Sequence, residues 1–162
     1  MTLARRHRKF VWLAGIAALI AALVALAWFW RGQAHPPSDA DDPQQVALGR
    51  QVYADYCASC HGVHLEGQPD WRRRKPDGHL PAPPHDYHGH TWRHPDVDLF
   101  GMVKEGMAAY AAPGYQTDMK GYAGVLTDAQ IWAVIAFIKS SWPPEFRTYQ
   151  SKITKGAQPR GE

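Results

Sequence analysis

Two cysteines and a histidine lie within five positions, in the segment Cys57-Ala58-Ser59-Cys60-His61. On a helix these two thiols are about one turn apart, so both can add across the two vinyl groups of one porphyrin. The imidazole of the following histidine is then placed beneath the porphyrin iron as an axial ligand. The C-x-x-C-H pattern therefore predicts covalent attachment of one haem c through Cys57 and Cys60, with His61 on the iron.

Other chemistries of paired cysteines fit the sequence less well. A thioredoxin-like dithiol needs its C-x-x-C beside a βαβ pattern, and the sequence shows no such pattern. A zinc site needs a second ligand pair of comparable spacing, and the chain contains only two cysteines. A simple disulfide between Cys57 and Cys60 is the remaining alternative.

Three segments with helical periodicity must position this motif. They are residues 44–56, residues 96–104, and the stretch from the capping box Thr127-x-x-Gln130 to the stop at Pro143. No alternating run of strand length competes with them, so we expect an all-α domain. Residues 62–94 and 107–126 are rich in Gly, Pro and His, and they are too long for irregular chain with only protein to pack on. A bound group is expected to fill the centre.

The N-terminal region predicts a membrane anchor. Residues 10–30 carry no charge, and as a helix they would span about 31 Å, which matches a bilayer core. Residues 1–9 are basic and should stay in the cytoplasm, so everything after the helix should lie outside it. We expect a single-pass protein of the bacterial inner membrane with its haem domain in the periplasm. A cleaved signal peptide, with small residues at Gly32 and Ala34, is the alternative, and it too leads to export.

The remaining chain divides by composition. Residues 31–43 resemble a polar linker, residues 44–143 form the domain, and residues 144–162 are expected to be a polar, mobile tail after the Pro143-Pro144 stop. The net charge of +3 comes from the ends, because residues 1–31 contribute +5, residues 32–144 contribute −4 and the tail contributes +2. A domain with this charge is not expected to bind nucleic acid.

Several motifs together resemble the monohaem, class I type cytochromes c, in a membrane-anchored bacterial form. They are the sequence CASCHG, Gly49-x-x-x-Tyr53 before it, the triplet Thr117-Asp118-Met119, and the apolar final helix. The resemblance covers nearly all of residues 43–142 and implies a class I fold around the haem. It implies that the first and last helices cross at a glycine, with Gly49 and Tyr53 against Val134 and Phe137. It also implies a hydrogen bond from His61 to the carbonyl of Pro83.

The far side of the iron requires a sixth ligand. The candidates are Met102, Met107 and Met119, and this family places its methionine where Met119 stands, eight residues before the final helix cap. Met102 lies within the middle helix, where methionine usually serves packing. We therefore expect His61/Met119 ligation, with Met107 and a histidine as alternatives.

One departure from the family pattern concerns the residue after this methionine. The family commonly has Met-Pro-x-Phe, and here Lys120 follows Met119. The loop thus lacks the restraint of a proline, and an amine stands next to the iron. Easier replacement of Met119 at raised pH is the expected consequence.

A histidine cluster in the Pro-rich loop raises the alternative of a second metal, copper or zinc. Its members are His64, His79, His85, His88, His90 and His94. The main prediction is a non-catalytic electron carrier with periplasmic or membrane redox partners. The alternatives are an electron-entry subunit of a larger oxidoreductase, a haem sensor or peroxidase-like protein with a labile sixth ligand, and a copper-handling protein.

Overall fold

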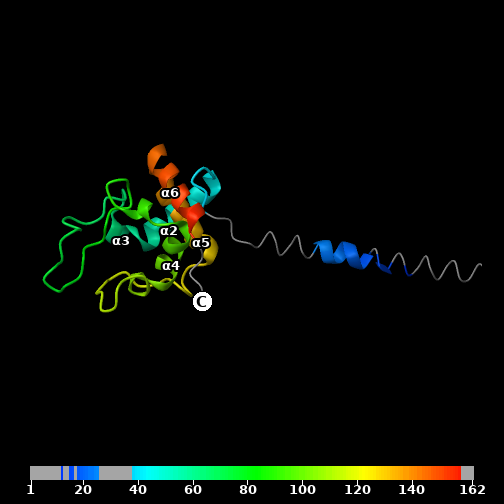
Figure 1. Cartoon of the computed structure of the whole chain (residues 1–162), viewed down its shortest axis with the longest axis horizontal. Helices are drawn as coiled ribbons and strands as arrows, with labels where there is room; N and C mark the ends of the chain where they lie inside the picture. Colours follow the sequence, from blue (N-terminus) through cyan, green and yellow to red (C-terminus); the bar gives the residue numbers. More distant parts are fainter. Residues whose placement is uncertain (1–11, 13–14, 17, 26–37, 158–162) are drawn as a thin grey trace, which may run out of the picture. The chain divides into compact units, whose positions relative to one another are not determined.

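The computed structural model describes residue 12, residues 15–16 and 18–25, and residues 38–157 (Figure 1). It forms two compact units, Met1–His35 and Pro36–Glu162. The described residues of the first unit are helical, and no helix among the described residues is long and apolar enough to cross a membrane. The predicted basic segment, about half of the predicted anchor and linker residues 31–37 lie outside the described residues.

Helices α2 (Pro43–Tyr56) and α5 (Asp128–Ser140) form the centre of the second unit. Asp42 caps α2 by accepting from the backbone N–H groups of Gln44 and Gln45, and the predicted capping box of α5 is present. The two helices cross at Gly49, where a Cβ atom would collide with the α5 backbone and come within 2.8 Å of the Cβ of Phe137. A glycine is therefore required at the crossing.

The middle helix α4 (Asp96–Glu105) packs against α5. The rings of Phe100 and Trp132 stack there at a centroid distance of 4.4 Å. Three short helical segments complete the elements that precede α5, namely α3 (Ala58–His61), η1 (Thr91–Arg93) and η2 (Met107–Ala109). Residues 38–157 contain no strand, which confirms the all-α prediction.

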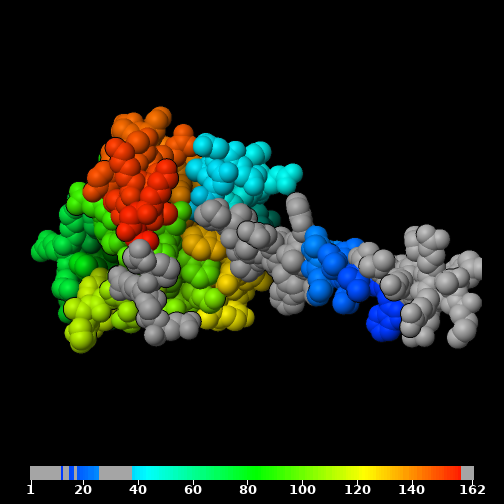
Figure 2. Space-filling model, turned by 45° about the vertical axis from the view of Figure 1, so that its right-hand side comes forward, coloured from blue at the N-terminus to red at the C-terminus, as the bar shows by residue number. Residues whose placement is uncertain are grey.

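A last helix, α6 (Pro144–Gly156), corrects the prediction of a mobile tail from residue 144. Phe146 packs its ring against Trp92 of η1 at 4.9 Å, and the side chain of Gln150 is fully buried. Figure 2 shows the orange-to-red helix lying on the surface of the domain. Pro144 is compatible with this helix because a proline at the first helical position has no N–H to satisfy.

A buried polar cluster fastens α6 and the segment before α2 to the core. Lys139 Nζ donates to both carboxylate oxygens of Asp96, at 3.0 and 2.9 Å, and to Ser38 Oγ at 2.8 Å. Gln150 Nε2 donates to the same carboxylate. Residues 38–43 therefore belong to the folded unit, and the predicted linker to residue 43 was too long.

Candidate haem-attachment site

The cysteine motif follows α2 without an intervening loop. Cys57 ends α2 and precedes the single turn of α3, and its carbonyl accepts from the N–H of Cys60 at 3.1 Å and of His61 at 2.9 Å. This turn places both thiols on one short helical segment, as attachment to two vinyl groups of one porphyrin requires. Cys57 is partly buried, Cys60 is exposed, and no disulfide joins them.

The electrostatics of Cys57 do not suit a dithiol oxidoreductase. Burial, with a smaller effect from Cys60, raises the pKa of the Cys57 thiol to about 12. Redox-active C-x-x-C motifs instead lower the pKa of their attacking thiol so that the thiolate is available at neutral pH. Residues 38–157 also contain no strand, so no βαβ unit stands beside the motif as the thioredoxin-like alternative requires.

His61 has the surroundings of a metal ligand. Its side chain is buried, and its Nδ1 lies 2.9 Å from the carbonyl oxygen of Pro83. Because a carbonyl can only accept, Nδ1 carries the proton and Nε2 keeps its lone pair for a metal. Burial lowers the pKa of His61, partly opposed by the bond to Pro83, so the neutral ring that binds iron is favoured.

The turn after His61 is fixed by backbone contacts. Gly62 adopts a φ of +82°, which favours glycine, and its carbonyl accepts from the Tyr53 hydroxyl at 2.9 Å. Gly67 N–H donates to the His61 carbonyl at 2.7 Å. Tyr53 also packs its ring on Phe137 at 5.3 Å, so the helix crossing and the cysteine motif share one residue.

A second histidine, His85, lies flat against His61. The two ring centroids are 4.0 Å apart and the planes are inclined by 23°. The Nδ1 atom of His85 lies 2.8 Å from the Thr91 hydroxyl. Sequence reasoning included His85 only in a cluster of six, because spacing does not show which imidazole of a loop reaches the ligand.

The sixth-ligand candidates lie in different local structures. Met119 N–H donates to the Thr117 hydroxyl at 3.0 Å, and the Met119 carbonyl accepts from Met107 N–H at 3.1 Å. Met107 and Met119 are thereby held in adjacent turns, whereas Met102 belongs to α4. All three side chains are partly buried.

Asp118 joins the loop of Met119 to the loop after α3. Its carboxylate accepts from Lys75 Nζ at 3.0 Å and lies 2.6 Å from His79 Nδ1. Figure 1 shows both loops extending to the same side of the helices. The long irregular segments before and after α4 therefore meet at Asp118.

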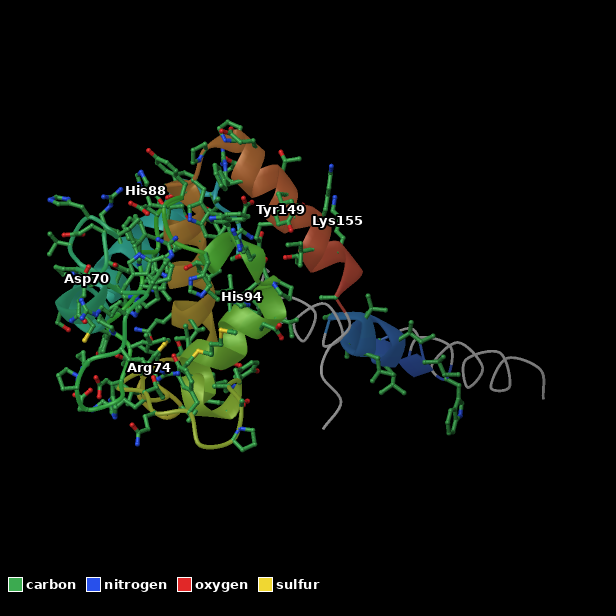
Figure 3. The ribbon with its side chains drawn as sticks, turned by 60° about the vertical axis from the view of Figure 1, so that its left-hand side comes forward. Asp70, Arg74, His88, His94, Tyr149 and Lys155 are labelled. Atoms are coloured by element: carbon green, nitrogen blue, oxygen red, sulfur yellow. The ribbon has the colours of Figure 1, made fainter. Side chains whose placement is uncertain are left out.

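The clustered histidines are held by different neighbours in the described part of the chain. Their partners differ, since His79 pairs with Asp118, His88 with Asp86, and His90 stacks on Trp71. His88 and His94 are well separated in Figure 3. Within the part of the chain that the structure describes, no three His, Cys, Asp or Glu side chains are arranged to hold a metal ion.

The donor set fits haem c, because two thiols one turn apart adjoin a buried histidine whose free nitrogen is available to iron. These features are those of a haem-binding domain. Residues 46–142 match the cytochrome c family model, which is more than half of the chain, and the protein belongs to the cytochrome c family. It therefore binds covalently attached haem c.

The chain is also similar to the thiosulfate dehydrogenase of Stutzerimonas stutzeri (strain A1501). The two share 29% identity over 121 residues, which cover 70% of this chain and 33% of that protein. The chain thus spans about a third of the length of this relative.

Proposed function

We propose that the protein is a non-catalytic, one-electron carrier whose haem iron is held between His61 and Met119. The main support is the pairing of His61 Nδ1 with the Pro83 carbonyl, which leaves Nε2 to the iron. The bound haem supplies the chemistry, a reversible change between ferric and ferrous iron. With His61 and Met119 both bound to it, the iron would offer no open position to a substrate.

Met119 is the best supported of the three methionines. Met102 belongs to α4, whereas Met119 lies in the loop that Asp118 fastens to Lys75 and His79 on the segment after α3. A thioether ligand stabilises ferrous iron, because soft sulfur suits the lower oxidation state. The Thr117 hydroxyl bonded to Met119 N–H restrains the loop in place of the proline that is missing after the methionine.

The residues of the chain keep the ligands in position during electron transfer. His61 is held by Pro83, and the cysteine motif is tied through Gly62 to Tyr53. A site whose ligands are already oriented needs little reorganisation when the iron charge changes. Residues 32–144 carry −4 and the docked helix α6 adds +2, so the folded unit has a small net negative charge that favours a redox partner with a positive docking surface.

The location and partners follow from the N-terminal sequence as proposals. The uncharged run 10–30 behind a basic segment supports a membrane-anchored protein with its haem domain in the periplasm, serving membrane or periplasmic redox partners. Release of the protein from isolated membranes by high salt alone would contradict the anchor.

An electron-entry subunit of a larger oxidoreductase is the second candidate. The observation that favours it is the similarity to one third of a thiosulfate dehydrogenase. Co-purification of the haem protein from native membranes, followed by mass spectrometry, separates a free carrier from a stoichiometric subunit.

Optical and electron paramagnetic resonance spectra of the purified haem-loaded protein test the ligand assignment. Ferric, low-spin iron with the weak red methionine-to-iron band is expected. Met119→Ala should abolish that band, and Met102→Leu and Met107→Leu should keep it. High-spin ferric iron in the wild type that readily binds peroxide would overturn the carrier function and favour a sensor or peroxidase. Loss of the band in Met107→Leu but not in Met119→Ala would reassign the ligand.

A further inference from the structure

We propose that His85 is a positioning residue that fixes the ring plane of His61 relative to the haem. This inference rests on the part of the proposed function that assigns His61 to the iron, and it is independent of the sixth ligand. His85 would act through His61 and would not contact the iron.

The hydrogen bond to Pro83 leaves one rotation of the His61 ring free. That bond restrains His61 at one atom, Nδ1, within the ring plane. Hydrogen bonds to carbonyl oxygens tolerate a broad range of directions, so this contact alone permits the ring to turn about its bond to a metal. A contact against the ring face is needed to select one plane.

His85 supplies that contact. Its ring is stacked on His61 at 4.0 Å between centroids with 23° between the planes. At this separation the two rings are in van der Waals contact, and turning His61 would drive its edge into its neighbour. The imidazole of His61 is thus held in its plane by Pro83 and across its face by His85.

His85 is held in place at both its backbone and its side chain. Its N–H donates to the Leu65 carbonyl at 2.8 Å, and its own carbonyl accepts from Trp142 Nε1 at 2.8 Å. The side chain is held separately, by the 2.8 Å contact between Nδ1 and the buried hydroxyl of Thr91. A ring that is held at both backbone and side chain resists displacement by the neighbouring His61 ring. An aliphatic side chain at position 85 would lack the contact with Thr91.

A fixed plane of the His61 ring has an electronic and a structural consequence. The plane of an axial imidazole decides which iron d orbital overlaps with the ring π system. In ferric low-spin haem this orientation determines the magnetic anisotropy. A fixed plane would also keep the ring from turning when a bound iron changes oxidation state. The orientation of His61 is therefore observable by methods that do not depend on electron-transfer activity.

The experiment compares haem-loaded wild type with His85→Leu, His85→Phe and Thr91→Val. His88→Leu is the control, since His88 is an exposed histidine on the same loop. Covalent haem content is measured first. The readouts are the electron paramagnetic resonance g values and the spread of the paramagnetically shifted haem methyl proton resonances.

His85→Leu is expected to change the g anisotropy and the methyl spread while the iron stays low-spin. His85→Phe keeps a flat ring without the Thr91 contact and should fall between Leu and wild type, as should Thr91→Val. His88→Leu should match wild type. If His85→Leu fails to accumulate with haem, the Phe and Val variants decide the question with the same readouts.

The proposal would be overturned if His85→Leu showed the g values and methyl shifts of the wild type. It would also be overturned if both His85→Phe and Thr91→Val did so. A change to high-spin iron in His85→Leu and His85→Phe would also overturn it, because His85 would then be a ligand itself. Failure of the carrier function is distinguishable, since it appears in the spectrum of the wild type, whereas failure of this inference appears only in the variants.

Discussion

Replacing Asp96 by alanine is expected to lower the free energy of unfolding by about 3–5 kcal/mol, the usual cost of breaking a buried ion pair from one side. The side chains of Asp96 and Lys139 are 8% and 12% exposed. The Asp96 carboxylate accepts from Lys139 Nζ, from Ser38 Oγ at 2.9 Å and from Gln150 Nε2 at 2.6 Å. Its removal leaves the Lys139 ammonium in the interior with only Ser38 as a partner.

The assay is urea unfolding of the haem-loaded protein, followed by circular dichroism. A loss of this size should also lower the melting temperature by roughly 10–20 °C for a domain of this length. Asp128→Ala is the matched control, because Asp128 also stands in the first turn of a helix and pairs with Lys104 at 2.9 Å. That pair is more than a third exposed on its lysine side, and removing it should cost less than about 1 kcal/mol.

A double variant separates the charge effect from packing. Asp96→Leu combined with Lys139→Met removes both charges, and it should recover much of the stability lost by Asp96→Ala. If Asp96→Ala costs no more than Asp128→Ala, the buried cluster does not stabilise the fold and the reasoning is refuted.

Further predictions concern the helix crossing, the ligand loop and pH. Gly49→Ala should prevent the approach of α2 to α5 and sharply reduce the amount of covalent haem per chain. Gly156→Ala is the control and should leave the haem content unchanged, because nothing lies within 4 Å of the added methyl group. Lys120→Ala should raise the pH at which the red methionine band of Met119 is lost, and an unchanged midpoint would exclude Lys120 as the replacing ligand. Burial lowers the pKa of His94, and this effect is partly opposed by Asp98. The stability that the neutral His94 ring contributes is therefore complete above about pH 6.5, the pKa of an unfolded histidine, and is lost as the pH falls towards the lower pKa of the folded protein. His94→Gln should therefore reduce the decrease in urea midpoint between pH 7.5 and 5.5, and an equal decrease in both proteins would contradict this.

Local signals in the sequence predicted the central helices well. The capping box at Thr127 and the apolar stripe behind it place the start of α5 correctly, because both depend on residues within one or two turns. The C-x-x-C-H motif likewise specified haem c, since its chemistry requires those residue types at that spacing. The His61 to Pro83 contact was available only through the family resemblance.

Features that depend on long-range packing were missed. Helix α6 was interpreted as a tail because its sequence is polar, and its docking depends on Trp92 and on the Asp96 carboxylate, about fifty residues earlier in the chain. The stacking of His85 on His61 was missed for the same reason, since six histidines of one loop are equivalent until the fold selects one. Such contacts have no short-range periodicity from which they could be predicted.

The docking of α6 also changes how the charge of the protein acts on its surroundings. Arg147, Lys152 and Lys155 outnumber Glu145 on this helix, and the residues that precede it from 32 to 144 carry −4. On a mobile tail these positive charges would average over many positions. On the docked helix Arg147 pairs with Asp41 at 2.7 Å, and the charges of Lys152 and Lys155 stay in one place on the domain. A charged partner therefore meets these positive charges at one fixed place, so the last helix contributes to how the domain is oriented before contact.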